Sequence, residues 1–137
     1  MNLLHIALAS LGGFVVYFAY GGLAFVLLPS LKTEFARYPG VYRDSDGQMA
    51  KMPIAMASTF VAILALSVLY AMAWRPGYGV LAGAHFGILV GIFVVCGFVL
   101  HNYVNLNIGS KLVLQQSVMY FVSWMLVGIA IGAIYRG

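Results

Sequence analysis

Charged residues are scarce in this sequence of 137 residues. Asp, Glu, Lys and Arg together make up 7% of the chain, whereas hydrophobic residues make up 64% and the mean hydropathy is +1.00. A soluble domain usually carries about a quarter charged residues, so water could not cover a folded globule of this composition. The scarcity of charge excludes a soluble domain of ordinary size and indicates that the lipid bilayer surrounds most of the chain.

Among the charged residues, acidic ones are scarcer than basic ones. The three acids of the chain, Glu34, Asp44 and Asp46, lie in one polar segment. An ion-coupled transporter usually keeps an ionisable carboxylate within the membrane, so this class is disfavoured, whereas a passive pore or a binding protein is not. No acid accompanies a serine and a histidine in the apolar stretches, and no phosphate-binding loop is present. We therefore predict no catalytic residues and a protein that is not an enzyme.

Cys96 is the single cysteine, which excludes an internal disulfide and leaves no metal-ligand spacing. Asp44-Ser45-Asp46-Gly47 is interpreted as a polar turn, because the remaining ligands of a calcium loop are missing. The sequence predicts no metal site. The net charge is +4, but the basic residues are scattered, so nucleic acid is not expected as a partner.

Four apolar stretches are long enough to cross a bilayer, since a spanning helix needs about 20 apolar residues. They cover residues 3–28, 53–74, 80–100 and 112–135. Residues 61–66 and 88–95 are apolar on both faces, which disfavours a β-barrel and favours helices. Pro53 is expected in the first turn of the second span. The sequence predicts an all-α antiparallel bundle of four transmembrane helices, forming one domain over residues 1–137.

The one long connection, residues 30–52, is predicted to lie at the membrane surface. Leu31, Phe35 and Tyr38 share one helical face there, which is typical of a short helix in the headgroup zone. Most basic residues share the side of this loop: Lys32, Arg37, Arg43, Lys51 and Lys111. The positive-inside rule places that side in the cytoplasm, so both termini are expected outside.

Glycines recur at every fourth position of the third span, forming a ridge of the glycine-zipper type. They are Gly79, Gly83, Gly87 and Gly91, and the last span repeats the spacing with Gly128 and Gly132. Without Cβ atoms along this ridge, another helix backbone can approach closely. The ridge is interpreted as a packing surface, and two partners remain open: a helix of the same chain or a helix of another subunit.

Polar residues gather where the third and fourth spans meet. The group consists of His101, Asn102, Tyr103, Asn105, Asn107, Gln115, Gln116 and, one turn further, Tyr120. His101 lies on the side of the glycine ridge and is expected to point into the bundle. The group is either a pocket for a lipid headgroup, a small solute or a partner loop, or a solvated turn whose amides cap two helix ends. The hydroxyls of Tyr17, Tyr20, Tyr70 and Tyr120 either line a cavity or belong to ordinary packing.

His5 and His85 lie at a similar depth near the end of the molecule that carries the termini. Two histidines on different helices can supply the axial nitrogens of a haem iron, so the pair is a candidate haem or pigment site. The alternative is that each histidine is a neutral, hydrogen-bonded residue of the membrane interface. No other cofactor is indicated.

The glycine-spaced third span and the last span, from Tyr120 through residues 128–135, resemble uncharacterised families of small bacterial integral membrane proteins with four spans. The resemblance implies the same fold and a bacterial inner-membrane location. The sequence favours a non-enzymatic protein that acts by helix packing, as an accessory subunit of a membrane complex or as a homo-oligomer. Two alternatives are a binder or transporter of a small neutral or amphipathic molecule, and a haem or pigment subunit.

Overall fold

A computed structural model covering residues 1–137 consists of helices only, and four of them are long and apolar enough to span a membrane. The four are α1 (Leu3–Leu27), α3 (Ser45–Ala73), a continuous rod over Val80–Asn105 and α6 (Ser110–Ile134). The rod comprises α4 (Val80–Val94), the π-helix η1 (Val95–Leu100) and α5 (His101–Asn105). The predicted bundle of four membrane helices is confirmed, and the chain is an integral membrane protein.

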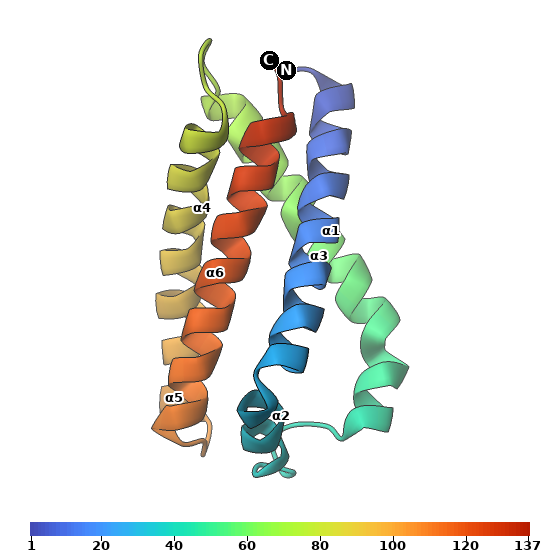
Figure 1. Ribbon diagram of the computed structural model, residues 1–137, viewed down its shortest axis with the longest axis vertical. Helices are drawn as coiled ribbons and strands as arrows, with labels where there is room; N and C mark the ends of the chain where they lie inside the picture. Colours follow the sequence, from blue (N-terminus) through green and yellow to red (C-terminus); the bar gives the residue numbers. More distant parts are fainter.

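The two ends of the bundle differ (Figure 1). Both termini and the turn between α3 and α4 lie at one end, which we call the termini end. The short helix α2 (Pro29–Ala36) and the turn between α5 and α6 lie at the other, the loop end. Pro29 ends α1 because it has no backbone N–H, and it opens α2 at a first-turn position where none is needed. The short helix expected in the long connection is therefore present.

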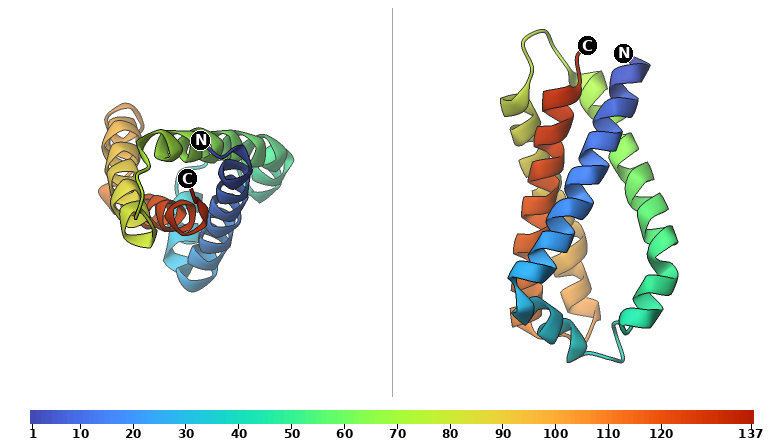
Figure 2. Two further views of the ribbon diagram at one scale, coloured as in Figure 1. Left: turned by 90° about the horizontal axis from the view of Figure 1, so that it is seen from above. Right: turned by 45° about the vertical axis from the view of Figure 1, so that its right-hand side comes forward.

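Helix α3 begins at Ser45, earlier than the sequence indicated. The Asp44 side chain accepts a hydrogen bond of 2.8 Å from the Gly47 backbone N–H, so the polar stretch predicted as a turn caps a helix instead. Pro53 lies inside α3, and its expected place in the first turn was wrong. An internal proline removes one backbone hydrogen bond. The N-terminal part of α3 leans away from the other helices (Figures 1 and 2).

Helix α6 is the centre of the bundle. It packs against α4 on one side and α1 on the other, and α3 packs mainly on α1 (Figures 1 and 2). The core at the termini end joins α1, α3 and α6 through Ile6, Ala9, Ile63, Tyr70, Ala71, Val127, Ile131 and Tyr135. Helices α1, α3 and α6 are therefore held together at the termini end, whereas α3 diverges towards the loop end.

The glycine ridge faces α6 of the same chain. A Cβ atom added at Gly87 would lie 2.7 Å from the carbonyl oxygens of both Met125 and Trp124, and one at Gly83 would lie 2.8 Å from the Gly132 Cα. From the other side, a Cβ at Gly128 would overlap the backbone of Gly87. The two backbones therefore touch along this interface, and nothing bulkier than glycine fits there without separating the helices. A Cβ atom added at Gly79, by contrast, would meet nothing within 4 Å.

Candidate functional site

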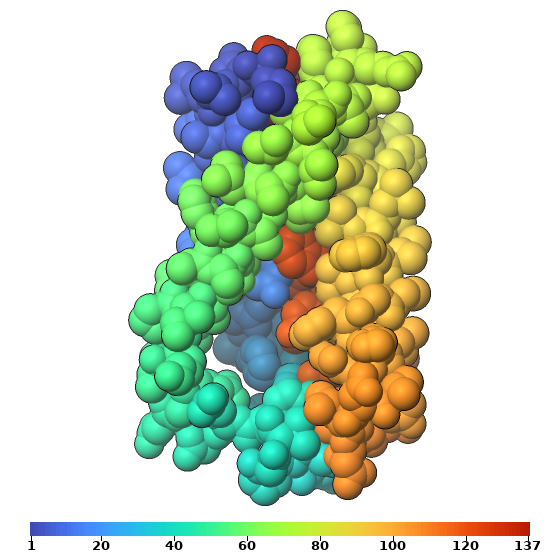
Figure 3. Space-filling view, turned by 180° about the vertical axis from the view of Figure 1, so that it is seen from behind, coloured from blue at the N-terminus to red at the C-terminus, as the bar shows by residue number.

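A cavity of about 1360 Å³ lies at the loop end, between the leaning part of α3 and the rest of the bundle. Figure 3 shows the molecule hollowed there, with α3 on one side of the opening and the segment around α2 below it. Typical sites for small ligands are about 300–1,000 Å³, so this cavity is large enough for a bulky amphipathic molecule. Its walls come from α1, α2, the following loop, α3, η1, α5 and α6.

Apolar side chains form a continuous part of the cavity wall. They come from every helix that borders it and are Phe25, Val26, Phe35, Ala36, Pro39, Val41, Met52, Ala55, Phe98, Val99, Leu106 and Met119. These side chains have no polar groups that need hydrogen-bond partners, so this part of the wall can contact the hydrocarbon part of a ligand. An apolar chain that entered from the bilayer would exchange one apolar environment for another while gaining close contacts.

Polar side chains line the remaining wall, and most of them belong to the loop end. They are Lys32, Tyr42, Arg43, Asp44, Ser45, Gln48, Lys51, Asn102, Gln116 and Tyr120. Three cations face the cavity against a single carboxylate, that of Asp44. The combination of an apolar wall with a polar wall of net positive charge is typical of a site for a molecule with both an apolar and a polar part.

The floor of the cavity is fixed because α2 packs on the first turns of α6. Leu31 of α2 is 1% exposed and belongs to a second core with Val99, Ile108, Leu112 and Val113. Phe35 and Tyr42 pack against this core, with their rings 4.8 Å apart in an edge-to-face arrangement. The face of Leu31, Phe35 and Tyr38 that predicted a surface helix therefore packs against the protein.

An ion-pair group holds the same contact from its polar side. The Lys111 ammonium donates to Glu34 Oε1 at 2.8 Å, and the Arg37 guanidinium lies 3.1 Å from the same oxygen. The hydrogen bond from Lys111 lowers the pKa of the Glu34 carboxyl below its usual value; burial opposes this shift, and the charges of Arg37 and Lys111 support it. Glu34 therefore stays ionised at neutral pH and links α2 to α6.

Glu34→Gln should lower the melting temperature at pH 7 by a few degrees. It should also make the melting temperature change less than that of the wild type as the pH is lowered. Because the folded pKa is depressed, this contribution to stability is complete above the unfolded carboxyl pKa of about 4.3 and is lost as the pH falls through the folded value. Melting curves at neutral and acidic pH would show the two proteins converging in acid. Asp46→Asn, at an exposed carboxylate without an ion pair, is the control. Parallel acid profiles for wild type and Glu34→Gln would contradict this role.

The glutamines of the predicted polar group bind the segment around α2. Gln116 donates to the Tyr42 hydroxyl at 3.1 Å, and Gln115 donates to the Ser30 hydroxyl at 3.2 Å. The Gly109 backbone N–H also donates to the Tyr38 hydroxyl at 2.9 Å. The first of the two interpretations of this polar group included contact with a partner loop. These residues do contact a loop, but the loop belongs to the same chain. Gln116 and Tyr120 also line the cavity, whereas Gln115 does not.

His101 is exposed and does not line the cavity, so the expectation that it points into the bundle was wrong. The cause is the π-helix η1, whose extra residue in the turn shifts every following side chain by about one position around the rod. The neighbouring Asn102 lines the cavity instead. Tyr103 and Asn105 are exposed, and the Asn105 amide donates to the His101 carbonyl at 3.0 Å, which caps the end of the rod.

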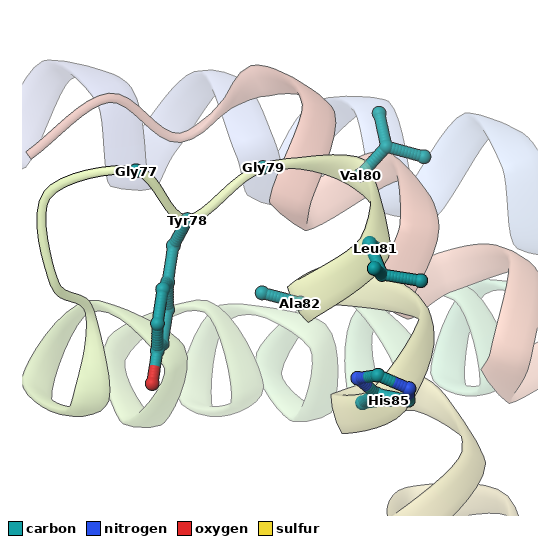
Figure 4. Close-up of a pocket in the computed structure, with 7 residues that line it drawn as sticks. All are labelled: Gly77, Tyr78, Gly79, Val80, Leu81, Ala82 and His85. Atoms are coloured by element: carbon teal, nitrogen blue, oxygen red, sulfur yellow. The ribbon is translucent and has the colours of Figure 1, made fainter.

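The two histidines proposed as haem or pigment ligands are not brought together. The His5 ring nitrogen bonds the Arg136 carbonyl oxygen, and His85 is exposed on α4, on the far side of α6 from α1 (Figure 1). His85 borders a shallow hollow of about 550 Å³ that is lined only by the contiguous segment from Gly77 to His85 (Figure 4). A single segment with one histidine supplies no second axial ligand from this chain.

Of the four tyrosines considered as cavity-lining residues, one lines the cavity and three do not. Tyr120 alone lines the cavity at the loop end. Tyr17 packs against Trp124, with ring centroids 5.2 Å apart, and Tyr70 is buried in the core at the termini end. Tyr20 is half-buried elsewhere on α1. No group of three or more His, Cys, Asp or Glu side chains is close enough to hold a metal ion.

The comparisons with known proteins return nothing for this chain: no family model, no curated protein and no solved structure matches it.

Sequence reasoning missed most of the cavity. Lys32, Arg43 and Lys51 were interpreted only as topology signals, because nothing in the linear order places them around one space. The available signal was the amphipathic face of α2. A helix with an apolar face needs an apolar partner surface, and Leu112 and Val113 at the start of the last span offered one.

Proposed function

We propose that this chain is a non-enzymatic membrane protein that binds an amphipathic molecule in the cavity at the loop end. The observation that carries the proposal is the composition of the cavity wall, which combines apolar side chains with polar ones of net positive charge. The α4–α6 pair and the core at the termini end act as a rigid frame, and the leaning part of α3 forms the open side. Ligand would enter from the bilayer through that side.

Ala55→Trp should reduce the amount of bound amphiphile severalfold, because Ala55 lines the cavity and an indole ring would occupy part of it. Native mass spectrometry of the protein released from mild detergent measures the fraction of molecules that carry a bound lipid mass. The matched control is Ala57→Trp, two residues along the same helix and about 200° around it, at an exposed position outside the cavity wall. Equal lipid retention by the two variants would count against binding in the cavity.

A second candidate is the packing role, as an accessory subunit or a homo-oligomer. The observation that favours it is the exposure of α3 over residues 45–58, where only Gly47 and Met52 are partly buried. The glycine ridge is occupied by α6, so a partner helix would use this part of α3. The same mass spectra report subunit number, and a strictly monomeric protein without co-purifying partners would exclude this role.

The location proposed is the bacterial inner membrane, with the loop end in the cytoplasm and both termini outside. The support is the distribution of basic residues, five at the loop end against two at the termini end, together with the positive-inside rule. Single cysteines introduced at Gly40 and Tyr78 in a Cys96→Ala background test this orientation. Labelling of the Gly40→Cys variant by a membrane-impermeant thiol reagent in intact cells would refute it.

A further inference from the structure

The basic residues at the loop end fall into two groups. Arg37 and Lys111 are paired with Glu34 and lie outside the cavity wall. The remaining three, Lys32, Arg43 and Lys51, lie within 4 Å of no carboxylate, and all of them line the cavity. Resting on the proposed binding function, we infer that the occupant is an anionic glycerophospholipid whose phosphate is held by these three cations.

The positive charge in the cavity has little acidic compensation. Asp44 is the only carboxylate in the wall, and its side chain accepts a hydrogen bond from the Gly47 N–H at the start of α3. Asp46, the other nearby acid, lies outside the cavity wall. Three cations against one acid leave an excess of two positive charges beside an apolar wall, and a bound lipid phosphate, with one negative charge, would offset half of that excess.

The three cations come from three separate segments. Lys32 belongs to α2, Arg43 to the loop that follows it and Lys51 to α3. Cations approaching from several directions suit a tetrahedral phosphate, which offers oxygens on every side. The Arg43 guanidinium can form two parallel hydrogen bonds to such a group, and each lysine supplies a mobile point charge.

Neutral hydrogen-bonding groups share the cavity wall with the cations. They are the Tyr42 hydroxyl, the Asn102 amide and the Tyr120 hydroxyl. Tyr120 lies ten residues into α6, a rise of about 15 Å, which is about half the thickness of the hydrocarbon layer. Phe98 and Met119 line the same cavity. The presence of cations, neutral donors and apolar side chains in one wall matches the phosphate, ester groups and acyl chains of a glycerophospholipid.

The apolar wall argues for a lipid rather than free phosphate. A free phosphate ion would use only the cations and would leave the wall formed by Phe25, Phe35 and Met52 without an occupant. A phosphate carried on acyl chains fills both parts of the cavity, and it is already anchored in the bilayer beside the opening between α3 and the rest of the bundle.

Native mass spectrometry with lipids of identical acyl chains tests the headgroup. The purified full chain is titrated with phosphatidylglycerol, phosphatidylcholine and diacylglycerol, and inorganic phosphate is added in a separate arm at matched ionic strength. We expect the anionic lipid to be retained about tenfold or more over the zwitterionic one at low salt, because the three nearby cations attract a headgroup of net negative charge. This preference should decrease as salt is added.

Two charge variants locate the effect. Lys32→Gln/Arg43→Gln/Lys51→Gln should bring the preference for phosphatidylglycerol close to one. The control, Arg75→Gln/Arg136→Gln, removes two cations at the termini end, outside the cavity wall and outside the ion pairs of Glu34, and should keep the preference. Both variants must show the helical content and the subunit number of the wild type. This control separates loss of lipid recognition from loss of folding.

The outcomes separate this inference from the proposed function. Equal retention of the three lipids by wild type, or a comparable loss of preference in both charge variants, overturns the anionic assignment. If Ala55→Trp still lowers retention of every lipid in that case, cavity binding stands. Displacement of phosphatidylglycerol by inorganic phosphate, but not by chloride of equal ionic strength, would show that the site recognises phosphate without needing the chains. Retention of all lipids that no variant changes would overturn both proposals.

Discussion

Gly87→Leu should strongly destabilise the bundle. The first added atom already lies 2.7 Å from two carbonyl oxygens of α6, and backbone atoms cannot rotate aside as side chains do. Overpacking costs typically about 1–3 kcal/mol where side chains can adjust, so a cost above that range is expected here. The α4 and α6 backbones would have to separate, which removes their mutual dispersion contacts along the whole interface.

The measurement is thermal unfolding in mild detergent, followed by helical circular dichroism and by the yield of monodisperse protein. Gly97→Leu is the control in the same rod, and Gly22→Leu is the control in α1. A Cβ at either position meets nothing within 4 Å. We expect both controls to melt within a few degrees of the wild type. A Gly87→Leu protein with wild-type melting and yield would show that α4 does not pack on α6 as described.

Leu31→Ala should release α2 from α6 and open the floor of the cavity. Leu31 is 1% exposed, and truncation of a fully buried leucine costs about 2–5 kcal/mol in well-packed cores. The contact between α2 and α6 is small, so a loss of this size is expected to act locally before it unfolds the spans. Hydrogen exchange of the α2 backbone should accelerate strongly, and lipid retention should fall along with it.

Leu28→Ala is the matched control, three residues earlier and 51% exposed. It removes the same atoms from a side chain that already faces outward, so little change is expected in exchange rate or lipid retention. Unchanged exchange in Leu31→Ala would mean that the hydrogen bonds from Lys111 and Gln116 hold the segment without the apolar contact. Faster exchange with unchanged lipid retention would mean that the floor formed by α2 is not needed for binding.

The sequence predicts the helical parts of this protein well where a single physical effect dominates. Apolar length and the absence of charge predict four spans, and the spacing of Gly83, Gly87 and Gly91 predicts close backbone approach. Prediction failed where two effects compete. Pro53 was assigned to a helix start, yet the cap at Asp44 begins the helix earlier and the proline is tolerated inside it. His101 was misplaced because the π-helix before it changes the register, and no residue type in residues 95–100 signals a π-helix.

Composition alone determined that lipid surrounds this chain, because a surface with so few charges cannot be covered by water. The segments that are apolar on both faces then favoured helices over a β-barrel. Only the tertiary structure decided which surfaces meet. The contacts that build the cavity join residues more than seventy positions apart, such as Glu34 to Lys111 and Tyr42 to Gln116. Such pairs have no periodicity in the sequence, since their distance depends on how α2 folds back over α6. The convergence of three unpaired cations on one apolar cavity depends on the same fold.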